Sequence, residues 1–123
     1  MIHLDTNFLV SVLRSGSAEE TKYDNWFKAK ESVGISAWVW AEFLCGPLSK
    51  RDEIISKQLF LLAEPLSGMD AEIAARLFNE TGRRSRSLAD CMIAAVAIRC
   101  GAKLARMNTS DFERFVPHGL ALI

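Results

Sequence analysis

The sequence has few cysteines, no excess of charge of either sign and no long apolar run. Fifteen Lys and Arg residues balance fifteen Asp and Glu residues, so no overall positive field attracts a polyanion. No stretch approaches the length of a membrane-spanning helix, and the N-terminus shows no basic leader followed by a long apolar run. We therefore expect a cytoplasmic protein with neither a membrane anchor nor a signal peptide.

The cysteines are Cys45, Cys91 and Cys100. Cys91 and Cys100 fall on one predicted helix at a separation of about 13 Å, which is too far for a disulfide. An odd, unpaired set of this kind is typical of reduced thiols. We expect these three side chains to fill the core.

The composition that is present belongs to a folded domain. Hydrophobic residues make up 50% of the 123 residues and charged residues 24%, which indicates a globular rather than a disordered chain. A chain of this length can bury a core of its own. We find no repeat, low-complexity segment or linker that would divide it, so we predict one domain over residues 1–123.

Short strand-like runs alternate with helix-like segments. Strands are predicted at residues 1–4, 33–35, 62–66, 103–107 and 119–122. Helices are predicted to begin near Phe8, after Thr6-Asn7, and near Ala18, and to occupy residues 37–45, 51–61, 71–81 and 88–100, with Ser36 and Asp70 as caps. This alternation predicts an α/β fold in which helices cover both faces of a parallel sheet.

Four acidic residues lie at the ends of apolar segments or inside them: Asp5, Glu42, Asp90 and Asp111. A carboxylate in apolar surroundings is costly unless a cation meets it. Four such residues therefore suggest a shared divalent cation. Carboxylate oxygens favour Mg²⁺ or Mn²⁺ over Zn²⁺, and no cluster of Cys and His competes with them.

The predicted topology can bring these acids together. In open parallel sheets, ligands bind beyond the carboxyl ends of the strands, near the point where the strand order reverses. Asp5 ends the first strand, Asp111 follows the strand at 103–107, and Asp90 begins the helix that precedes that strand. Glu42 joins them if its helix runs alongside the first strand.

Each acid also has a structural interpretation. Asp90 and Ser87 resemble a capping box at the start of a helix. Glu42 could face solvent on the polar side of its helix, and Asp111 could be a turn residue. Asp5 is the hardest to explain in this way, because a carboxylate at the end of a central strand has little structural use there.

Together these segments resemble those of a known family. The matching pieces are Leu4-Asp5-Thr6-Asn7, Ala41-Glu42, Ser87-Leu88-Ala89-Asp90 leading into Ile93-Ala94-Ala95, and Asn108-Thr109-Ser110-Asp111-Phe112. In this order they are similar to the motifs of PIN-domain ribonucleases, in particular the VapC-type toxins of toxin–antitoxin pairs. The resemblance covers essentially the whole chain.

The resemblance implies a fold, a chemistry and partners. The fold is a three-layer α/β/α sandwich with a parallel sheet of about five strands, commonly dimeric. The chemistry is metal-dependent hydrolysis of RNA, with Mg²⁺ or Mn²⁺ held by the catalytic residues Asp5, Glu42, Asp90 and Asp111. Asn7 and Thr109 would be polar support. The partners are an RNA substrate and a cognate antitoxin protein.

Two further features bear on these partners. Arg83, Arg84 and Arg86 form the best local basic patch, which either contacts RNA phosphates or is a solvated loop. The aromatic residues are numerous for one small core, and we expect some of them to line an apolar groove for an amphipathic antitoxin segment or a homodimer interface: Trp26, Phe27, Trp38 and Trp40.

Three other functions fit parts of the sequence. A housekeeping RNA-processing PIN nuclease would share the same motifs. A receiver domain has a similar length and alternation, but it needs a pair of acids after the first strand and a phospho-acceptor Asp after the third, and residues 63–67 supply none. A PIN-like module that only binds RNA or assembles complexes would lack the acids, and all four are present.

Overall fold

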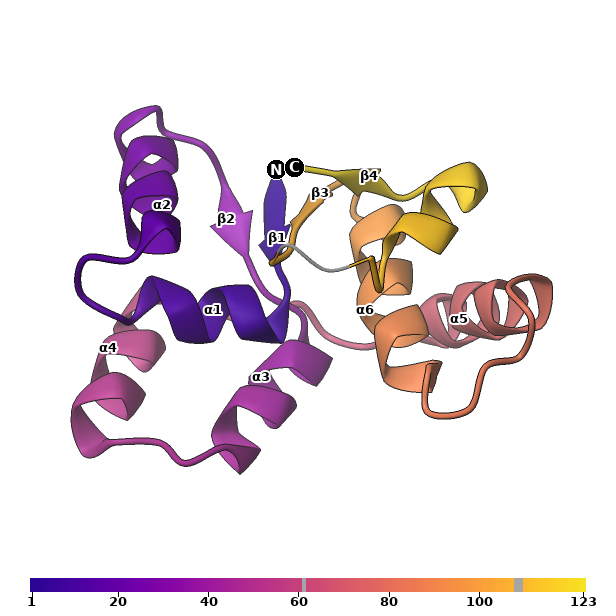
Figure 1. Ribbon diagram of the computed structural model, residues 1–123, viewed down its shortest axis with the longest axis horizontal. Helices are drawn as coiled ribbons and strands as arrows, with labels where there is room; N and C mark the ends of the chain where they lie inside the picture. Colours follow the sequence, from indigo (N-terminus) through magenta and orange to yellow (C-terminus); the bar gives the residue numbers. More distant parts are fainter. Residues whose placement is uncertain (61, 108–109) are drawn as a thin grey trace.

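The computed structural model describes residues 1–60, 62–107 and 110–123, and Figure 1 shows their arrangement. The strands are β1 (Ile2–Leu4), β2 (Val33–Gly34), β3 (Lys103–Ala105) and β4 (Ala121–Leu122). The helices are α1 (Thr6–Val12), α2 (Ala18–Lys28), α3 (Ala37–Cys45), α4 (Lys50–Leu59), α5 (Gly68–Glu80), α6 (Leu88–Arg99) and the 3-10 helix η1 (Glu113–His118).

The strands form one parallel sheet in the order β2-β1-β3-β4. The inner pair is β1 and β3, in a register that places His3 opposite Leu104 and Leu4 opposite Ala105. The chain moves from β1 to β2 on one side and returns to β3 on the other. The strand order therefore reverses between β1 and β3, and a crevice is expected beyond their carboxyl ends.

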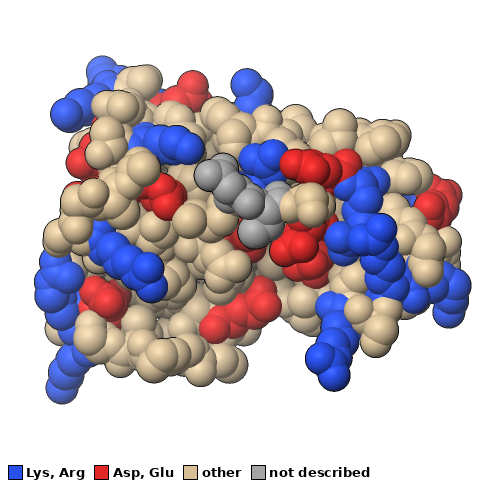
Figure 2. Space-filling model, viewed as in Figure 1, with Lys and Arg blue, Asp and Glu red and all other residues tan. Residues whose placement is uncertain are grey.

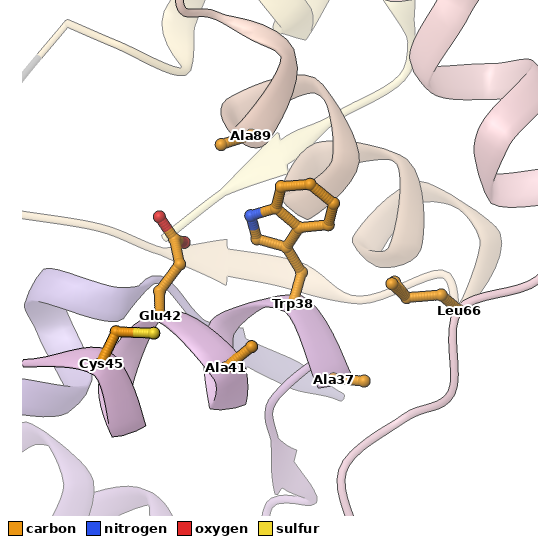
Figure 3. Close-up of a pocket in the computed structure, with 7 residues that line it drawn as sticks. All are labelled: Ala37, Trp38, Ala41, Glu42, Cys45, Leu66 and Ala89. Atoms are coloured by element: carbon orange, nitrogen blue, oxygen red, sulfur yellow. The ribbon is translucent and has the colours of Figure 1, made fainter.

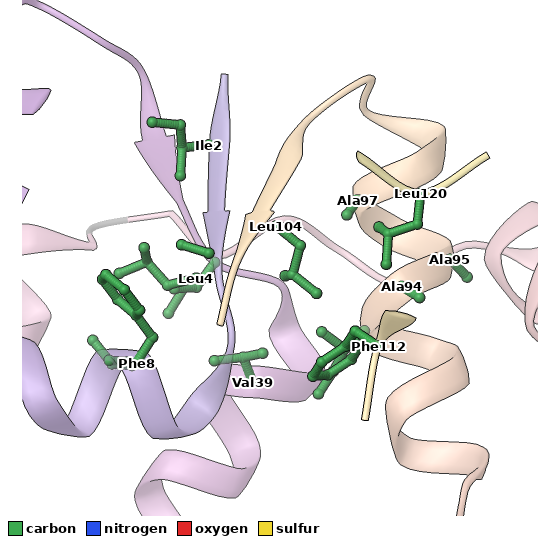
Figure 4. Packing of buried hydrophobic residues seen from close by; sticks show 14 of the residues in the cluster. Ile2, Leu4, Phe8, Val39, Ala94, Ala95, Ala97, Leu104, Phe112 and Leu120 are labelled. Atoms are coloured by element: carbon green, nitrogen blue, oxygen red, sulfur yellow. The ribbon is translucent and has the colours of Figure 1, made fainter. Parts of the chain in front are cut away.

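Helices cover both faces of the sheet, as the alternating pattern predicted. In Figure 1, α1 and α2 lie on one side of the strands and α5 and α6 on the other, while α3 lies beyond the carboxyl ends and contacts both α1 and α6. The apolar side chains of β1 and β3 pack between these layers, and Figure 4 shows Leu4 and Leu104 of the strands with Phe8 of α1 and Phe112 of the turn before η1. The inner strands are buried because each of their faces meets a helix.

Local signals explain most helix boundaries. Helix α3 begins where predicted, because Ser36 Oγ accepts a hydrogen bond from the Val39 N–H. Helix α6 is followed by Gly101, whose φ of +62° is the left-handed conformation that favours glycine. Helix α1 differs from the prediction. It begins at Thr6, two residues before Phe8, because Asp5 caps it.

The predicted strand at residues 62–66 is wrong. This segment makes only an isolated bridge in which Glu64 pairs with Ser36, beside the hydrogen bond from the Glu64 N–H to the Ile35 carbonyl. Pro65 has no N–H with which to extend the ladder. The sheet therefore has four strands among the described residues instead of about five. The strand predicted to end at Met107 also stops earlier, at Ala105, because its neighbour β1 gives way to α1 after Leu4.

Two further expectations need correction. Asp70 does not precede its helix: Ser67 is the cap of α5, and Asp70 is its reciprocal partner three residues later in a capping box. The cysteines do not all fill the core, since Cys91 is buried but Cys45 is exposed at the end of α3. Within the described residues, no helix is both long and apolar enough to cross a membrane.

Candidate metal centre

Asp5 lies where β1 passes into α1, at the strand-order reversal. It is 7% exposed, and its Oδ1 accepts a hydrogen bond of 2.6 Å from the Thr6 N–H. Asp5 therefore has the structural use that the sequence did not suggest, because it caps α1. One N–H does not offset the burial of a full negative charge, so the cap alone does not account for a carboxylate at this position.

Glu42 reaches the same region from α3. Its side chain is exposed, and its Oε1 accepts a hydrogen bond of 2.9 Å from the Thr6 hydroxyl. Thr6 thus contacts two of the predicted acids, through its N–H and its hydroxyl. The sequence reading did not select Thr6 as a site residue, although its place directly after Asp5 at the start of a helix was a usable signal.

Asp90 lies in the first turn of α6 and is half-buried. The capping-box interpretation is not supported, because Ser87 makes no side-chain cap and its hydroxyl instead donates to the Arg84 carbonyl at 2.7 Å. The partner of Asp90 is Arg114, whose Nη2 lies 3.6 Å from its Oδ2. Arg114 was also missed by sequence reasoning, although it follows Asp111 by three residues.

Asp111 is exposed and lies in the turn that precedes η1, as its structural interpretation allowed. Its carbonyl accepts a hydrogen bond from Arg114 Nη1. Arg114 therefore joins the side chain of Asp90 to the backbone of Asp111. Thr109, predicted as polar support, lies outside the described residues.

The four acids act on one another electrostatically. Burial raises the pKa of the Asp5 carboxyl from its ordinary value of 3.8 to about 6, and the hydrogen bond from Thr6 opposes that rise. The neighbouring negative charges that add to it are those of the other three acids: Asp90, Glu42 and Asp111. In Figure 2, several acidic side chains gather near the middle of this face of the molecule.

Asp90 is affected in the same way. Burial raises the pKa of its carboxyl, and the charges of Asp111 and Glu42 raise it further, while Arg114 opposes the rise. The carboxyls of Asp5 and Asp90 therefore both have raised pKa values, and the negative charges of Glu42 and Asp111 contribute to the rise of each. Such clustering of perturbed acids marks a functional site more often than a structural one.

The chemistry of these side chains fits a hard divalent cation, although they are not arranged around one. In the described part of the chain, no three Asp, Glu, His or Cys side chains lie close enough together to hold a metal ion as they stand. All four candidate ligands are carboxylates, which suit Mg²⁺ and Mn²⁺. A dication would also offset the repulsion and burial that raise the pKa of Asp5.

An apolar pocket adjoins Glu42 on its other side. Its volume is about 470 Å³, and its lining comes from α3, the segment before α5, and α6: Ala37, Trp38, Ala41, Glu42, Cys45, Leu66 and Ala89. Figure 3 shows the Trp38 ring and the Glu42 carboxylate both reaching from α3 toward α6. The lining is mostly apolar, so this hollow suits a hydrophobic partner better than an ion.

The remaining predicted residues lie outside the acidic cluster or at its edge. Asn7 is exposed and lines a shallow depression with Val10, Ser11, Arg14 and Met107. The arginines at 83, 84 and 86 are exposed on the loop before α6. Arg83 and Arg86 have φ values of +50° and +64°, a left-handed conformation that is unusual for side chains with a Cβ.

The four aromatic residues that the sequence reading assigned to a groove or interface are in different environments. Trp26 stacks on Phe8 with ring centroids 5.7 Å apart, and Trp40 stacks on Phe43 at 5.8 Å, so both contribute to packing. Phe27 is 73% exposed on α2. Trp38 is the one of the four that lines the apolar pocket.

Comparison with known proteins identifies similar chains. The family model described as PIN domain matches residues 2–116. The structure of FitAcB from Neisseria gonorrhoeae is 25% identical with a TM-score of 0.69, over 100% of this chain and 96% of that one. The comparison with curated proteins gave no match.

Two further solved structures, both 20% identical, show the same fold. VapBC2 from Rickettsia felis, bound to a DNA fragment from its promoter, has a TM-score of 0.77 and covers 100% of this chain and 98% of its own. VapC20 from Mycobacterium tuberculosis, described as a toxin that cleaves the sarcin-ricin loop, has a TM-score of 0.70 over the same shares of the two chains.

Proposed function

The chain belongs to the PIN-domain family, and from that premise we propose that it is a Mg²⁺- or Mn²⁺-dependent endoribonuclease and the toxin of a toxin–antitoxin pair. The observation that carries the proposal is the buried Asp5 at the carboxyl end of β1, whose pKa is raised in part by the charges of three other acids, Asp90, Glu42 and Asp111. The solved relatives add support, because VapC20 is described as a toxin that cleaves the sarcin-ricin loop.

The proposed ligands of the cation are the carboxylates of Asp5, Glu42, Asp90 and Asp111. When bound, the cation supplies the polarisation of the phosphodiester and the acidification of water that hydrolysis needs. The chain orients three of these carboxylates. Thr6 donates its N–H to Asp5 and its hydroxyl to Glu42, and Arg114 holds Asp90. No protein nucleophile is required.

We assign RNA contact to the loop that contains Arg83, Arg84 and Arg86. This loop leads directly into α6, whose first turn contains Asp90, and its arginines are exposed. Guanidinium groups near the acids could hold phosphates on either side of the cleaved bond and would make binding depend on salt. We also propose Asn7, which is exposed near the start of α1, as polar support for the site.

The activity is tested with purified protein, a looped RNA and either Mg²⁺ or excess chelator. Cleavage is expected with Mg²⁺ or Mn²⁺ and not in chelator. Asp5→Asn, Glu42→Gln, Asp90→Asn and Asp111→Asn are each expected to lower the rate at least about 100-fold, because each removes a charged ligand of the cation on which hydrolysis depends. Asp24→Asn and Glu72→Gln, exposed acids on α2 and α5, are matched controls. Undiminished cleavage after chelation would refute the metal requirement.

Asp90→Ala tests whether Asp90 is a residue of the proposed site or only stabilises the start of α6. Ser87 and Asp90 form no capping box, so this substitution is expected to change the free energy of unfolding by less than about 1 kcal/mol while abolishing cleavage. A variant that melts early and still cuts RNA would remove Asp90 from the proposed site.

We place a short amphipathic antitoxin segment in the depression between α1, α2 and α4. Its volume is about 230 Å³, and it combines apolar walls with charged residues of both signs: Val12, Leu13, Glu20, Tyr23, Asp24, Arg51, Ile55 and Leu59. An amphipathic helix inserts apolar anchors into such a groove and pairs its charges at the rim. FitAB and VapBC2 are both described in complex with DNA, as expected for toxins whose partners bind DNA.

The neighbouring genes distinguish this proposal from a housekeeping RNA-processing nuclease. A small adjacent reading frame for a DNA-binding protein, whose product co-purifies with this chain and blocks cleavage, is expected for a toxin. Leu59→Lys should weaken that complex, and Leu62→Lys, at a 90% exposed position outside the depression, should not. A non-binding neighbour, or none, would favour the housekeeping function.

A further inference from the structure

Arg114 is the cation that the fold builds into the acidic cluster. Its guanidinium contacts Asp90 Oδ2 at 3.6 Å and donates to the Asp111 carbonyl. Its central carbon lies 4.4 Å from the centre of the Phe115 ring, which is fully buried. Its side chain is 14% exposed. The guanidinium is thus held on three sides, by an acid, a backbone carbonyl and an aromatic face.

The buried position of Arg114 leaves one of its nitrogens without a hydrogen bond in the part of the chain that the structure describes. Arg114 Nε is buried and has no hydrogen-bond partner among the described residues. A buried donor without a partner is unfavourable, so the contacts of the two terminal nitrogens must compensate. Those contacts join the third and fourth acids of the cluster, which lie on separate elements, α6 and the turn before η1.

A guanidinium and a divalent cation compete for the same carboxylate. The oxygen of Asp90 that faces Arg114 already has a positive partner, and a dication that approaches it meets the repulsion of Arg114. Arg114 also limits the mutual repulsion of the acids when no dication is bound. The same contact therefore favours the metal-free fold and disfavours metal binding.

We propose that Arg114 is a positioning residue that serves as the internal counter-cation of the acidic cluster: it holds Asp90 beside Asp111 without a divalent cation, and it weakens the affinity of the cluster for that cation. The inference rests on the proposed metal-dependent function. It goes beyond that function because it assigns to one residue the control of metal affinity.

The test measures Mn²⁺ binding to the full chain without RNA, by calorimetry and by the electron paramagnetic resonance signal of free Mn²⁺. Arg114→Met keeps an apolar side chain against Phe115 and removes the charge. It is expected to bind Mn²⁺ about tenfold more tightly, the order of magnitude for loss of one like charge a few ångströms from a dication in a solvated site. Arg114→Lys keeps the charge and is expected to stay within about threefold of the parent, on the same scale.

The matched control is Arg106→Met. Arg106 is also partly buried with an unpartnered Nε among the described residues, but its guanidinium contacts Glu113 at 3.3 Å instead of one of the four acids. It removes the same charge and should leave the Mn²⁺ affinity within about twofold. An Arg114→Met chain that is folded by circular dichroism and binds Mn²⁺ no more tightly than the parent overturns the inference. If that variant does not fold, Arg114→Gln is held to the same criterion.

RNA cleavage is measured separately, so the two proposals can fail independently. A parent that binds Mn²⁺ but does not cleave RNA refutes the proposed nuclease and still allows Arg114 to be tested. A purely structural role for Arg114 predicts a lower melting temperature in chelator with unchanged Mn²⁺ affinity, and that result also overturns the inference.

Discussion

Asp5 has two opposed effects on the free energy of unfolding. Its Oδ1 caps α1 through the Thr6 N–H, which stabilises the fold, whereas its burial beside three other acids makes its negative charge unfavourable. A folded-state pKa of about 6 against an ordinary value of 3.8 means that the folded chain binds this proton more tightly than the unfolded chain does. The stabilisation from that proton is complete below about pH 4 and is lost as the pH rises through about 6.

Because the folded state raises the pKa of Asp5, we predict that Asp5→Asn changes the stability measured in chelator. Asparagine keeps the cap and has no charge, so near pH 7.5 the variant should be more stable than the parent, by up to about 3 kcal/mol for a pKa rise of this size. Near pH 4 the two free energies of unfolding should nearly coincide. Urea unfolding at the two pH values measures this, with Asp24→Asn as the matched control at an exposed position. A parent more stable than Asp5→Asn at pH 7.5 without metal would contradict the burial of an unfavourable charge.

At the scale of elements, a buried ion pair ties α5 to α6. Arg99, at the end of α6, contacts Asp70 Oδ1 at 2.6 Å and Glu64 Oε1 at 3.0 Å, and it also donates to the Pro65 carbonyl. Asp70 is fully buried, and it belongs to the capping box that starts α5. One guanidinium therefore fixes the start of α5, the end of α6 and the segment between α4 and α5.

Removing the charge of Asp70 should destabilise the fold without affecting the chemistry. Asp70→Asn leaves Arg99 without its most buried partner, and because Arg99 is itself 24% exposed we expect a loss of about 2–4 kcal/mol, below the range for a fully buried pair. Chemical denaturation measures the loss. RNA cleavage by the folded variant should stay within about twofold of the parent, since Asp70 is remote from the four acids. Glu72→Gln, on an exposed position of the same helix, should change stability by less than about 0.5 kcal/mol.

At the scale of the whole molecule, the apolar pocket beside Glu42 has exposed apolar side chains in its lining and at positions close to the lining in the chain. Leu66, which lines the pocket, is 41% exposed, Met69 at the start of α5 is 58% exposed, and Leu88, next to Ala89 in the chain, is 52% exposed. Exposed apolar side chains beside an apolar pocket are typical of an interaction site. We propose it as the interface of the homodimer that the family resemblance implies.

The dimer prediction is tested by light scattering on the full chain. The parent should have twice the mass of one chain, and Leu66→Lys, which places a charge in the pocket lining, should shift it toward the mass of one chain. Leu62→Lys places the same charge at a 90% exposed position that does not line the pocket, and it should leave the dimer intact. A parent that is monomeric at about 100 μM would reject the interface, since stable interfaces of standard size hold well below that concentration.

The sequence by itself determined the fold class, and it selected the four acids that we propose as ligands, because these signals are local or follow from topology. Ser36 starts α3 through a hydrogen bond that spans three residues, and Gly101 follows the end of α6. Strand–helix alternation implies a parallel sheet, and Asp5 directly follows the carboxyl end of its inner strand β1. The strand predicted at residues 62–66 does not form, because an apolar run becomes a strand only if a neighbouring backbone pairs with it. Local sequence signals do not determine that pairing.

Only the tertiary structure decided the long-range partners of Glu42, Asp90 and Asp70. Thr6 and Glu42 are 36 residues apart, Asp70 and Arg99 are 29 residues apart, and Arg114 reaches Asp90 from another element. No periodicity or spacing encodes such pairs. They depend on how α3, α5 and α6 pack around β1 and β3, which places side chains that are distant in the chain within hydrogen-bond reach. That same packing buries Asp5 and so raises its pKa to about 6.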